Sequence, residues 1–360
     1  MTRPVLLVTN HAPPARVGAF ALLAEREKVE VALFGGRLRH GAAPAGELGF
    51  PHRHITQRQA FSLASSGRYR AVLAGTNGRT ALPAAYAGAR RAGIPFVLWA
   101  TLWAQPRGPA GLAGYAPLRW IYAHADAVAT YGPHVSAYVR ARGARNVHAA
   151  PQAVDDAFWG APADCAPDLR RADFQALFAG RLEAEKGLSQ LLAAWRMTGL
   201  TPPDGALVLA GAGQEPEPAP GVFGAGALDA NRLRNFYRGC DVVVIPSIVT
   251  RTFREPWGLV ANEAMHAGLP VIATDAVGAA AGGLVRHERN GLVVPAGDVG
   301  ALAGAIERLR TDGNARVRMG ANARQDACVY THAAWADGVT RALAAVGASR
   351  LEPKPPATRG

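Results

Sequence analysis

The segment REPWGLVANEAMHAGLPVIATD, residues 254–275, decides the fold of the chain. Residues 258–267 have the apolar pattern of one helix, which we expect to end at Gly268, because a glycine stops a helix and a proline two residues later prevents its continuation. Residues 271–273 form a short apolar run typical of a buried strand. Another such run, DVVVIPS at 241–247, precedes the helix, so the order strand, helix, strand predicts a parallel α/β unit.

The same alternation recurs along the whole chain, with helical patterns between short apolar runs. The strands expected in the first half are Val5–Val8, Val29–Phe34, Ala71–Leu73, Phe96–Leu98, Ala127–Thr130 and Val147–Ala149. Those expected in the second half are Gln175–Phe178, Leu207–Leu209, Val242–Ile245, Val271–Ala273 and Leu292–Val294. Continuous apolar strands that alternate with helices predict an α/β fold of two doubly wound, Rossmann-like domains.

The domain limits follow from composition. Residues 150–168 are rich in proline, alanine and aspartate and have no helical period, so we expect an N-terminal domain over 1–155 and a C-terminal domain over 156–332. A last helix over 333–348 is expected to cross back to the first domain. The tail, 349–360, holds three prolines and is expected to be disordered.

Composition excludes several classes of protein. Of the 360 residues, 49% are apolar and 18% charged, which predicts sizeable cores. No apolar run approaches the roughly 20 residues that span a bilayer, and the first apolar run is too short for a signal peptide, so we expect a cytoplasmic protein. Cys165, Cys240 and Cys328 have neither a disulfide nor a metal spacing.

The charge is uneven. Residues 1–155 hold 18 basic and 6 acidic residues, and residues 156–360 hold 21 of each, so the net charge of +12 lies in the first half. Such a field favours an anionic partner; the alternative is a generally arginine-rich composition. Residues 52–70 are expected to form an amphipathic surface helix that contacts an anionic membrane from the cytoplasmic side, the alternative being an ordinary solvated helix. Its basic and apolar residues are Arg53, Arg58, Arg68, Arg70, Phe61 and Leu63.

Two segments carry residues suited to a phosphorylated sugar. The helix over 258–267 starts after a strand's carboxyl end, so its first free N–H groups suit a phosphate. Glu255 and Glu263 frame it and suit hydroxyl groups; the alternatives are a helix-start carboxylate and an exposed helix residue. Arg181 and Lys186 follow another strand and suit a diphosphate. The alternative there is a turn in which they pair with Glu183 and Glu185.

Together these segments resemble the C-terminal domain of family-4 retaining glycosyltransferases, the glycosyl transferases group 1, which have the GT-B fold of two domains facing across a cleft. The resemblance covers roughly residues 174–330. The matching elements are Gly180-Arg181-Leu182 with Lys186-Gly187, Pro246-Ser247, Glu255 to Glu263, Gly268-Leu269-Pro270-Val271 and GLVVPAGD at 291–298.

The resemblance implies transfer of a sugar, with retention, from a nucleotide-diphosphate donor to a glycan, lipid-linked glycan or small-molecule acceptor, without a cofactor or metal ion. Its implied catalytic residues are Arg181, Lys186 and Glu255, of which Glu255 binds the transferred sugar. Its implied donor-binding residues are Glu263 at the ribose, the backbone of Gly258, Leu259 and Val260, Ser247, and a loop with Val222, Phe223 and Gly224 at the base.

The first half departs from the family pattern. Where many relatives have a Gly-Gly loop after the first strand, this chain has HAPPARVGAF, in which Arg16 and Gly18 are the candidate loop residues. The segment WATLWAQ, residues 99–105, lacks the histidine that many relatives carry. The acceptor is expected to bind in this half, but its chemistry does not follow from the sequence.

Two other functions compete with sugar transfer. A GT-B sugar-nucleotide epimerase would need acid and base carboxylates and histidines that the sequence does not place. A basic nucleic-acid-binding protein would need a clustered basic helix or a recognition module, whereas the arginines here are scattered, so no nucleic acid is expected as a partner.

Overall fold

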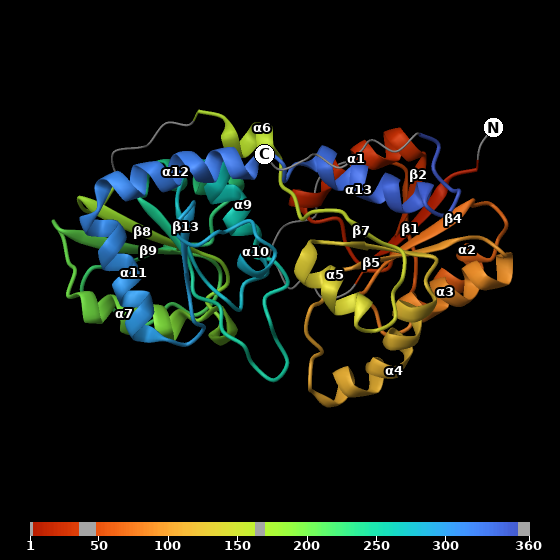
Figure 1. Cartoon of the computed structure of the whole chain (residues 1–360), viewed down its shortest axis with the longest axis horizontal. Helices are drawn as coiled ribbons and strands as arrows, with labels where there is room; N and C mark the ends of the chain where they lie inside the picture. Colours follow the sequence, from red (N-terminus) through yellow and green to blue (C-terminus); the bar gives the residue numbers. More distant parts are fainter. Residues whose placement is uncertain (1–2, 36–47, 163–169, 352–360) are drawn as a thin grey trace. The chain divides into compact units, whose positions relative to one another are not determined.

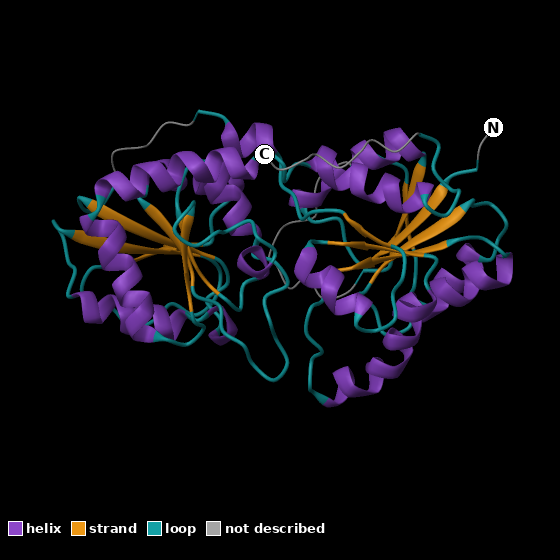
Figure 2. Cartoon of the chain, in the orientation of Figure 1, coloured by secondary structure: helices purple, strands orange, loops and turns teal. Residues whose placement is uncertain are grey.

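The computed structural model describes residues 3–35, 48–162 and 170–351. They form two compact α/β units, each a parallel sheet with helices on both faces (Figures 1 and 2). The predicted α/β fold of two doubly wound units is therefore confirmed. Unit 1 comprises Met1–Asp155 and Tyr330–Gly360, and unit 2 comprises Asp156–Val329.

Unit 1 contains a seven-stranded parallel sheet in the order β3-β2-β1-β4-β5-β6-β7. Its strands are β1 (Val5–Thr9), β2 (Val29–Leu33), β3 (His52–His54), β4 (Ala71–Gly75), β5 (Phe96–Ala100), β6 (Ala127–Thr130) and β7 (Val147–Ala149). Its helices are α1 (Pro14–Glu27), α2 (Gln59–Ala64), α3 (Ala81–Ala92), α4 (Pro109–His124), α5 (Pro133–Arg140) and α13 (His332–Ala344). Helices α1 and α13 pack side by side on one face of the sheet (Figure 1).

Unit 2 contains a six-stranded parallel sheet in the order β10-β9-β8-β11-β12-β13. Its strands are β8 (Phe174–Ala179), β9 (Gly205–Ala210), β10 (Val222–Gly226), β11 (Val242–Ile245), β12 (Val271–Thr274) and β13 (Gly291–Val294). Its helices are α6 (Asp156–Gly160), the short 3₁₀ helix η2 (Ala184–Lys186), α7 (Leu188–Thr198), α8 (Ala230–Gly239), α9 (Leu259–His266), α10 (Gly278–Ala281), α11 (Val299–Thr311) and α12 (Gly313–Ala327).

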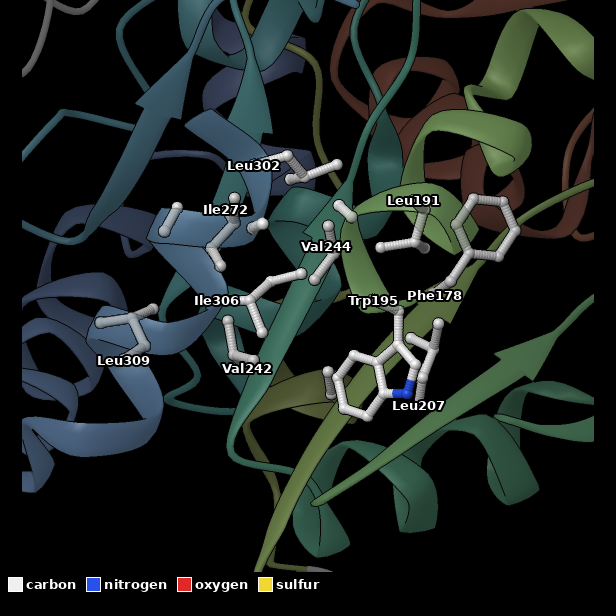
Figure 3. Close-up of a cluster of buried hydrophobic side chains, with 14 of the residues drawn as sticks. Phe178, Leu191, Trp195, Leu207, Val242, Val244, Ile272, Leu302, Ile306 and Leu309 are labelled. Atoms are coloured by element: carbon white, nitrogen blue, oxygen red, sulfur yellow. The ribbon is translucent and has the colours of Figure 1, made fainter. Parts of the chain in front are cut away.

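The core of unit 2 lies between its sheet and the helices α7 and α11 (Figure 3). Trp195 of α7 is only 1% exposed and packs with Leu191 beside the strands β8 and β9. Ile306 of α11 is fully buried against the strand residues Val242 and Val244. This packing holds the strands in place, and so it fixes the edge of the sheet at which their carboxyl ends lie.

The expected amphipathic surface helix over residues 52–70 is not present. This stretch forms β3, a loop, the six-residue α2 and the approach to β4. Arg53 pairs with Glu30, and Arg70 pairs with the buried Glu27, so neither offers a free charge to a membrane. The physical reason is that the partners of these arginines lie on α1 and β2, far away in the sequence. Among the described residues, no helix is long and apolar enough to cross a membrane.

A buried ion pair joins the two ends of unit 1. Glu27, at the end of α1, is fully buried and accepts hydrogen bonds from Arg70 Nη2 at 2.8 Å, Ser349 Oγ at 2.6 Å and Arg350 N at 2.9 Å. Arg70 Nε also donates to the carbonyl of Ala348 at 2.6 Å. Residues 349–351 are thus tied down, contrary to the expected disordered tail, of which residues 352–360 lie outside the described part of the chain.

We predict that Arg70→Met lowers the free energy of unfolding by about 3–5 kcal/mol, because it leaves the Glu27 carboxylate buried without its cation. The double variant Arg70→Met, Glu27→Leu should recover part of this loss, since no uncompensated charge then remains. Urea denaturation measures both, with the exposed Arg58→Ala as the control, expected within about 0.5 kcal/mol of the original chain. A single variant as stable as the control would contradict this role.

Candidate functional site

Two loops meet at the carboxyl edge of the unit 2 sheet. The strands β8 and β11 are hydrogen-bonded neighbours, so the chain segments that leave them begin side by side. Gly187 has φ +74°, and a Cβ built there would lie 1.9 Å from the carbonyl oxygen of Pro246. Only glycine therefore allows this contact between the two loops. The backbone N–H of Ile248 also donates to the carbonyl of Glu185 at 3.1 Å.

This contact brings Lys186, Ser247 and Glu255 together. Lys186 Nζ donates to Glu255 Oε2, and Ser247 Oγ donates to the same oxygen at 3.2 Å. Ser247 is 1% exposed and Glu255 is 7% exposed, so the hydrogen bond between these two residues is shielded from water. Lys186 Nζ also lies 5.4 Å from the centre of the Phe253 ring. Glu255 is therefore the counter-ion of Lys186.

Arg181 lies on the same loop but has different partners. Its guanidinium pairs with Glu183 and lies 3.6 Å from Glu185 Oε1. The alternative interpretation of this loop, a turn with local ion pairs, therefore holds for Arg181 and fails for Lys186. Glu183 and Arg181 both keep solvent exposure, so this pair is a weak one.

The helix α9 begins at a glycine. Its N-cap residue, Gly258, has φ +88° and brings no side chain to cap the first turn. A Cβ at Gly258 would meet Val277 Cγ1 at 3.1 Å, so glycine allows both the left-handed backbone and the close packing. The first N–H groups of a helix can bind an anion, so the role predicted for Gly258, Leu259 and Val260 stays a prediction.

A buried pair that the sequence did not indicate holds the start of α9. Trp257 Nε1 donates to Asn262 Oδ1 at 2.6 Å, and the two residues are 2% and 0% exposed. The bond joins the residue before the N-cap to the first turn and a half of the helix. An asparagine within an apolar helical pattern could have indicated a buried hydrogen bond. Its partner was not predictable, because Trp257 lies five positions earlier in an irregular loop.

Glu263 points to a different neighbour. It lies on α9, where Tyr237 Oη of α8 donates to its Oε2 at 2.8 Å. Burial raises the pKa of the Glu263 carboxyl to about 7, although the Tyr237 hydrogen bond opposes this shift. Burial also raises the pKa of Tyr237, so the phenol keeps its proton. The alternative of an exposed helix residue is wrong, because the residue is half-buried and its carboxylate is bonded to Tyr237.

The three residues predicted to form a base-binding loop form a strand instead. Val222, Phe223 and Gly224 belong to β10, the edge strand of the sheet, and β9 separates it from β8. Periodicity failed here because the segment VFGAG carries two glycines and has no long apolar run. Gly224 lies against Glu215 of the preceding proline-rich stretch, with a Cβ built on Gly224 only 2.8 Å from Glu215 Oε1.

The expected loop around Arg16 and Gly18 is also a different structure. Both residues lie in α1, which starts at Pro14 with Pro13 as its N-cap. Gly18 packs against α13, where a Cβ would lie 2.6 Å from His332 Nδ1. A proline at the first helical position is a known start signal, so the run Pro13-Pro14 could have indicated this helix.

In the described ranges, no group of three or more His, Cys, Asp or Glu side chains could hold a metal ion.

The fold of the two units is that of the GT-B class. The structure aligns with Anabaena HepE, solved with UDP and glucose, at a TM-score of 0.73 and 18% identity over 95% of this chain and 99% of HepE. It aligns with sucrose-phosphate synthase from Thermosynechococcus elongatus at a TM-score of 0.71 and 21% identity, over 93% and 96% of the two chains. At these identities the likeness concerns the fold.

The sequence of unit 2 matches a known family. The matching residues are 167–326, and the family is described as Glycosyl transferases group 1. An uncharacterized glycosyltransferase of Methanocaldococcus jannaschii is 32% identical over 169 residues, which are 44% of this chain and 41% of that protein. The D-inositol 3-phosphate glycosyltransferase of Stackebrandtia nassauensis is 37% identical over 110 residues, 30% and 23% of the two chains. These matches span less than half of the curated relatives.

We predict that Glu263 makes stability fall as the pH rises. A carboxyl whose pKa is raised to about 7 in the folded chain stabilises it below its unfolded pKa, near 4.5, and loses that contribution as the pH passes 7. The loss amounts to about 3 kcal/mol, and Glu263→Gln should remove it. The measurement is unfolding free energy from pH 4.5 to 8 for both chains, compared as a difference.

Tyr237→Phe provides the second variant. It removes the hydrogen bond that lowers the pKa of Glu263, so the fall in stability should move to higher pH. Identical pH profiles for the original chain and Glu263→Gln would show that Glu263 does not titrate in this range.

Proposed function

We propose that this chain is a retaining glycosyltransferase that takes a sugar from a nucleoside-diphosphate donor. The observation that carries the proposal is the Lys186–Glu255 pair beside the uncapped start of α9, at the carboxyl edge of a parallel sheet. Open α/β sheets bind their ligands at this edge. The match of residues 167–326 to the group 1 family supports the same activity.

The donor diphosphate would interact with Lys186, Arg181 and the first N–H groups of α9. Lys186 is a compact charge already held in place by Glu255, and Arg181 offers a planar fork that suits phosphate oxygens. Because Glu255 would repel the diphosphate, Lys186 screens that carboxylate while Glu255 accepts hydrogen bonds from the sugar hydroxyls. Glu263, with one oxygen held by Tyr237, would accept the ribose hydroxyls.

In the transfer step the bond between the anomeric carbon and the diphosphate oxygen breaks, and its electron pair stays on the phosphate. The acceptor oxygen forms the new bond on the same face, and its proton passes to the leaving phosphate. The charge that develops on that phosphate is what the cations and helix N–H groups stabilise. HepE, of the same fold, was solved with UDP and glucose, which makes UDP-glucose the first donor to test.

The direct test is binding and turnover. Calorimetry with UDP, GDP and ADP identifies the base, and NMR of the product identifies the anomer. An inverted anomer would contradict the retaining mechanism. Release of an epimerised sugar nucleotide without an acceptor would instead indicate an epimerase.

We predict that Lys186→Ala and Arg181→Ala each lower kcat by roughly 10²–10³, because each removes a cation that stabilises the leaving diphosphate. Turnover of the cognate donor measures this, and circular dichroism checks that the variants are folded. Arg232→Ala, an exposed arginine on α8, is the matched charge control and should keep full activity. If both site variants keep near-normal turnover, the diphosphate assignment is wrong.

We predict that substitutions of Glu263 and Glu255 affect the binding of different ligands. Glu263→Ala should weaken binding of the bare nucleoside diphosphate, since that ligand contains the ribose. Glu255→Ala should leave that binding nearly unchanged but impair binding and use of the complete donor, which alone contains the sugar. Titration calorimetry with both ligands decides between these cases. Equal losses for both ligands in both variants would refute the separate ribose and sugar roles.

A further inference from the structure

Arg16 is a buried cation without a carboxylate partner among the described residues. The residue is 4% exposed, and its Nη2 donates to Tyr131 Oη at 2.9 Å. Aromatic rings surround its guanidinium carbon, at 4.9 Å from the ring centre of Trp99, 5.3 Å from Tyr131 and 5.8 Å from Trp335. Trp335 comes from α13, so this aromatic box is closed by the last helix of the chain.

Three buried donors in this box have no partner within the described part of the chain. They are Arg16 Nη1, Trp99 Nε1 and Trp335 Nε1. Arg16 lies against both rings, and its guanidinium carbon is nearer to the ring of Trp99. Aromatic faces attract a guanidinium, but they accept no conventional N–H hydrogen bond. A buried charge and an unmade hydrogen bond both destabilise a folded protein, and such groups are often retained for a function.

The box lies at the edge where a ligand is expected. Arg16 is in the first turn of α1, which follows β1, and no side chain caps that turn. Tyr131 directly follows β6, and Trp99 is the fourth of the five residues of β5. All three therefore lie at or near the carboxyl edge of the unit 1 sheet, the edge at which open α/β sheets bind ligands.

The surrounding charge favours an anion. Residues 48–125 contain nine arginines, no lysine and no acidic residue. Three of these arginines, Arg53, Arg70 and Arg90, pair with acidic residues outside the stretch, so the excess positive charge comes from the other six. This stretch supplies β3 to β5 and α2 to α4, which form much of unit 1. A field of one sign raises the local concentration of ligands of the opposite sign.

We propose that Arg16 and Trp99 form an anion-binding site for the acceptor, which therefore carries a phosphate or a carboxylate group. The proposal rests on the proposed function, since an acceptor presupposes sugar transfer. Arg16 Nη1 donates to one oxygen of the anion, and Trp99 Nε1 donates to the same or a second oxygen. This charge-assisted bond gives Arg16 Nη1 an acceptor, which it does not have among the described residues.

Arg16→Met separates this role from a purely structural one. Methionine fills the box with an apolar chain and removes the charge, so the melting temperature in anion-poor buffer should stay the same or rise. If the guanidinium mainly supports the fold, the same variant should melt lower. Tyr131→Phe is a second variant that keeps the cation and removes only its hydrogen bond.

The experiment measures the melting temperature of the full chain with inorganic phosphate, with acetate and with chloride at matched ionic strength. We expect phosphate or acetate, but not chloride, to raise it by roughly 3–6 °C at about ten times the Kd. Arg16→Met should lose this rise, and Tyr131→Phe should keep it. The response to phosphate or to acetate identifies which anion the acceptor carries. Arg91→Met, an exposed arginine of α3, is the charge control and should respond like the original chain.

The UDP titration separates this site from the donor site. Arg16→Met should bind UDP as the original chain does. Loss of UDP affinity would mean that Arg16 holds the donor diphosphate, and an equal phosphate rise in Arg16→Met would mean that the anion binds elsewhere; either result overturns the proposal. If the original chain binds no nucleoside diphosphate but keeps the Arg16-dependent phosphate rise, the anion site stands and the proposed function fails.

Discussion

Parallel pairing of β8 with β11 is the constraint on which the site depends. Since parallel strands end at one edge, the loop after each strand starts beside the loop of its neighbour. This places Lys186 and Glu255 in contact although 69 positions separate them in the sequence. The core between the sheet and the helices α7 and α11 holds the strands in place. Gly187 allows the loops that follow β8 and β11 to touch. The same rule, applied to the sheet of unit 1, puts Arg16 near the ends of β5 and β6.

The chain treats its buried charges in three ways. Glu27 is neutralised by Arg70 and by donors from the C-terminal segment, so its charge contributes to holding unit 1 together. Glu263 lies in a site where burial outweighs its single phenol hydrogen bond, so its pKa rises to about 7. Arg16 cannot follow that route, because a guanidinium stays protonated in proteins. Among the described residues Arg16 has no carboxylate partner, and a buried charge without one is costly, which is why we propose that it binds an anion.

The sequence predicted the fold class and every strand except β3 and β10, because buried parallel strands are continuous apolar runs. It missed these two because His-Arg-His and a glycine-rich segment have no such run. It also misjudged Arg53 and Arg70, whose exposure depends on partners in distant elements. The Tyr237–Glu263 bond joins two helices, and no spacing within one element indicates it. Local pattern therefore identified the elements, while side-chain partners required the packed structure.

The two cations of the unit 2 site differ in how easily a ligand could recruit them. Arg181 pairs with Glu183 on an exposed loop, and exposed pairs contribute about 0–1 kcal/mol, so a diphosphate can replace that partner at small cost. Lys186 pairs with a buried carboxylate, and separating such a pair costs several kcal/mol. Lys186 is thus best suited to bind phosphate while keeping Glu255, whereas Arg181 is suited to move onto the ligand. In the proposed donor site, one fixed cation and one that can change its partner would keep the site rigid before the donor binds and more strongly charged afterwards.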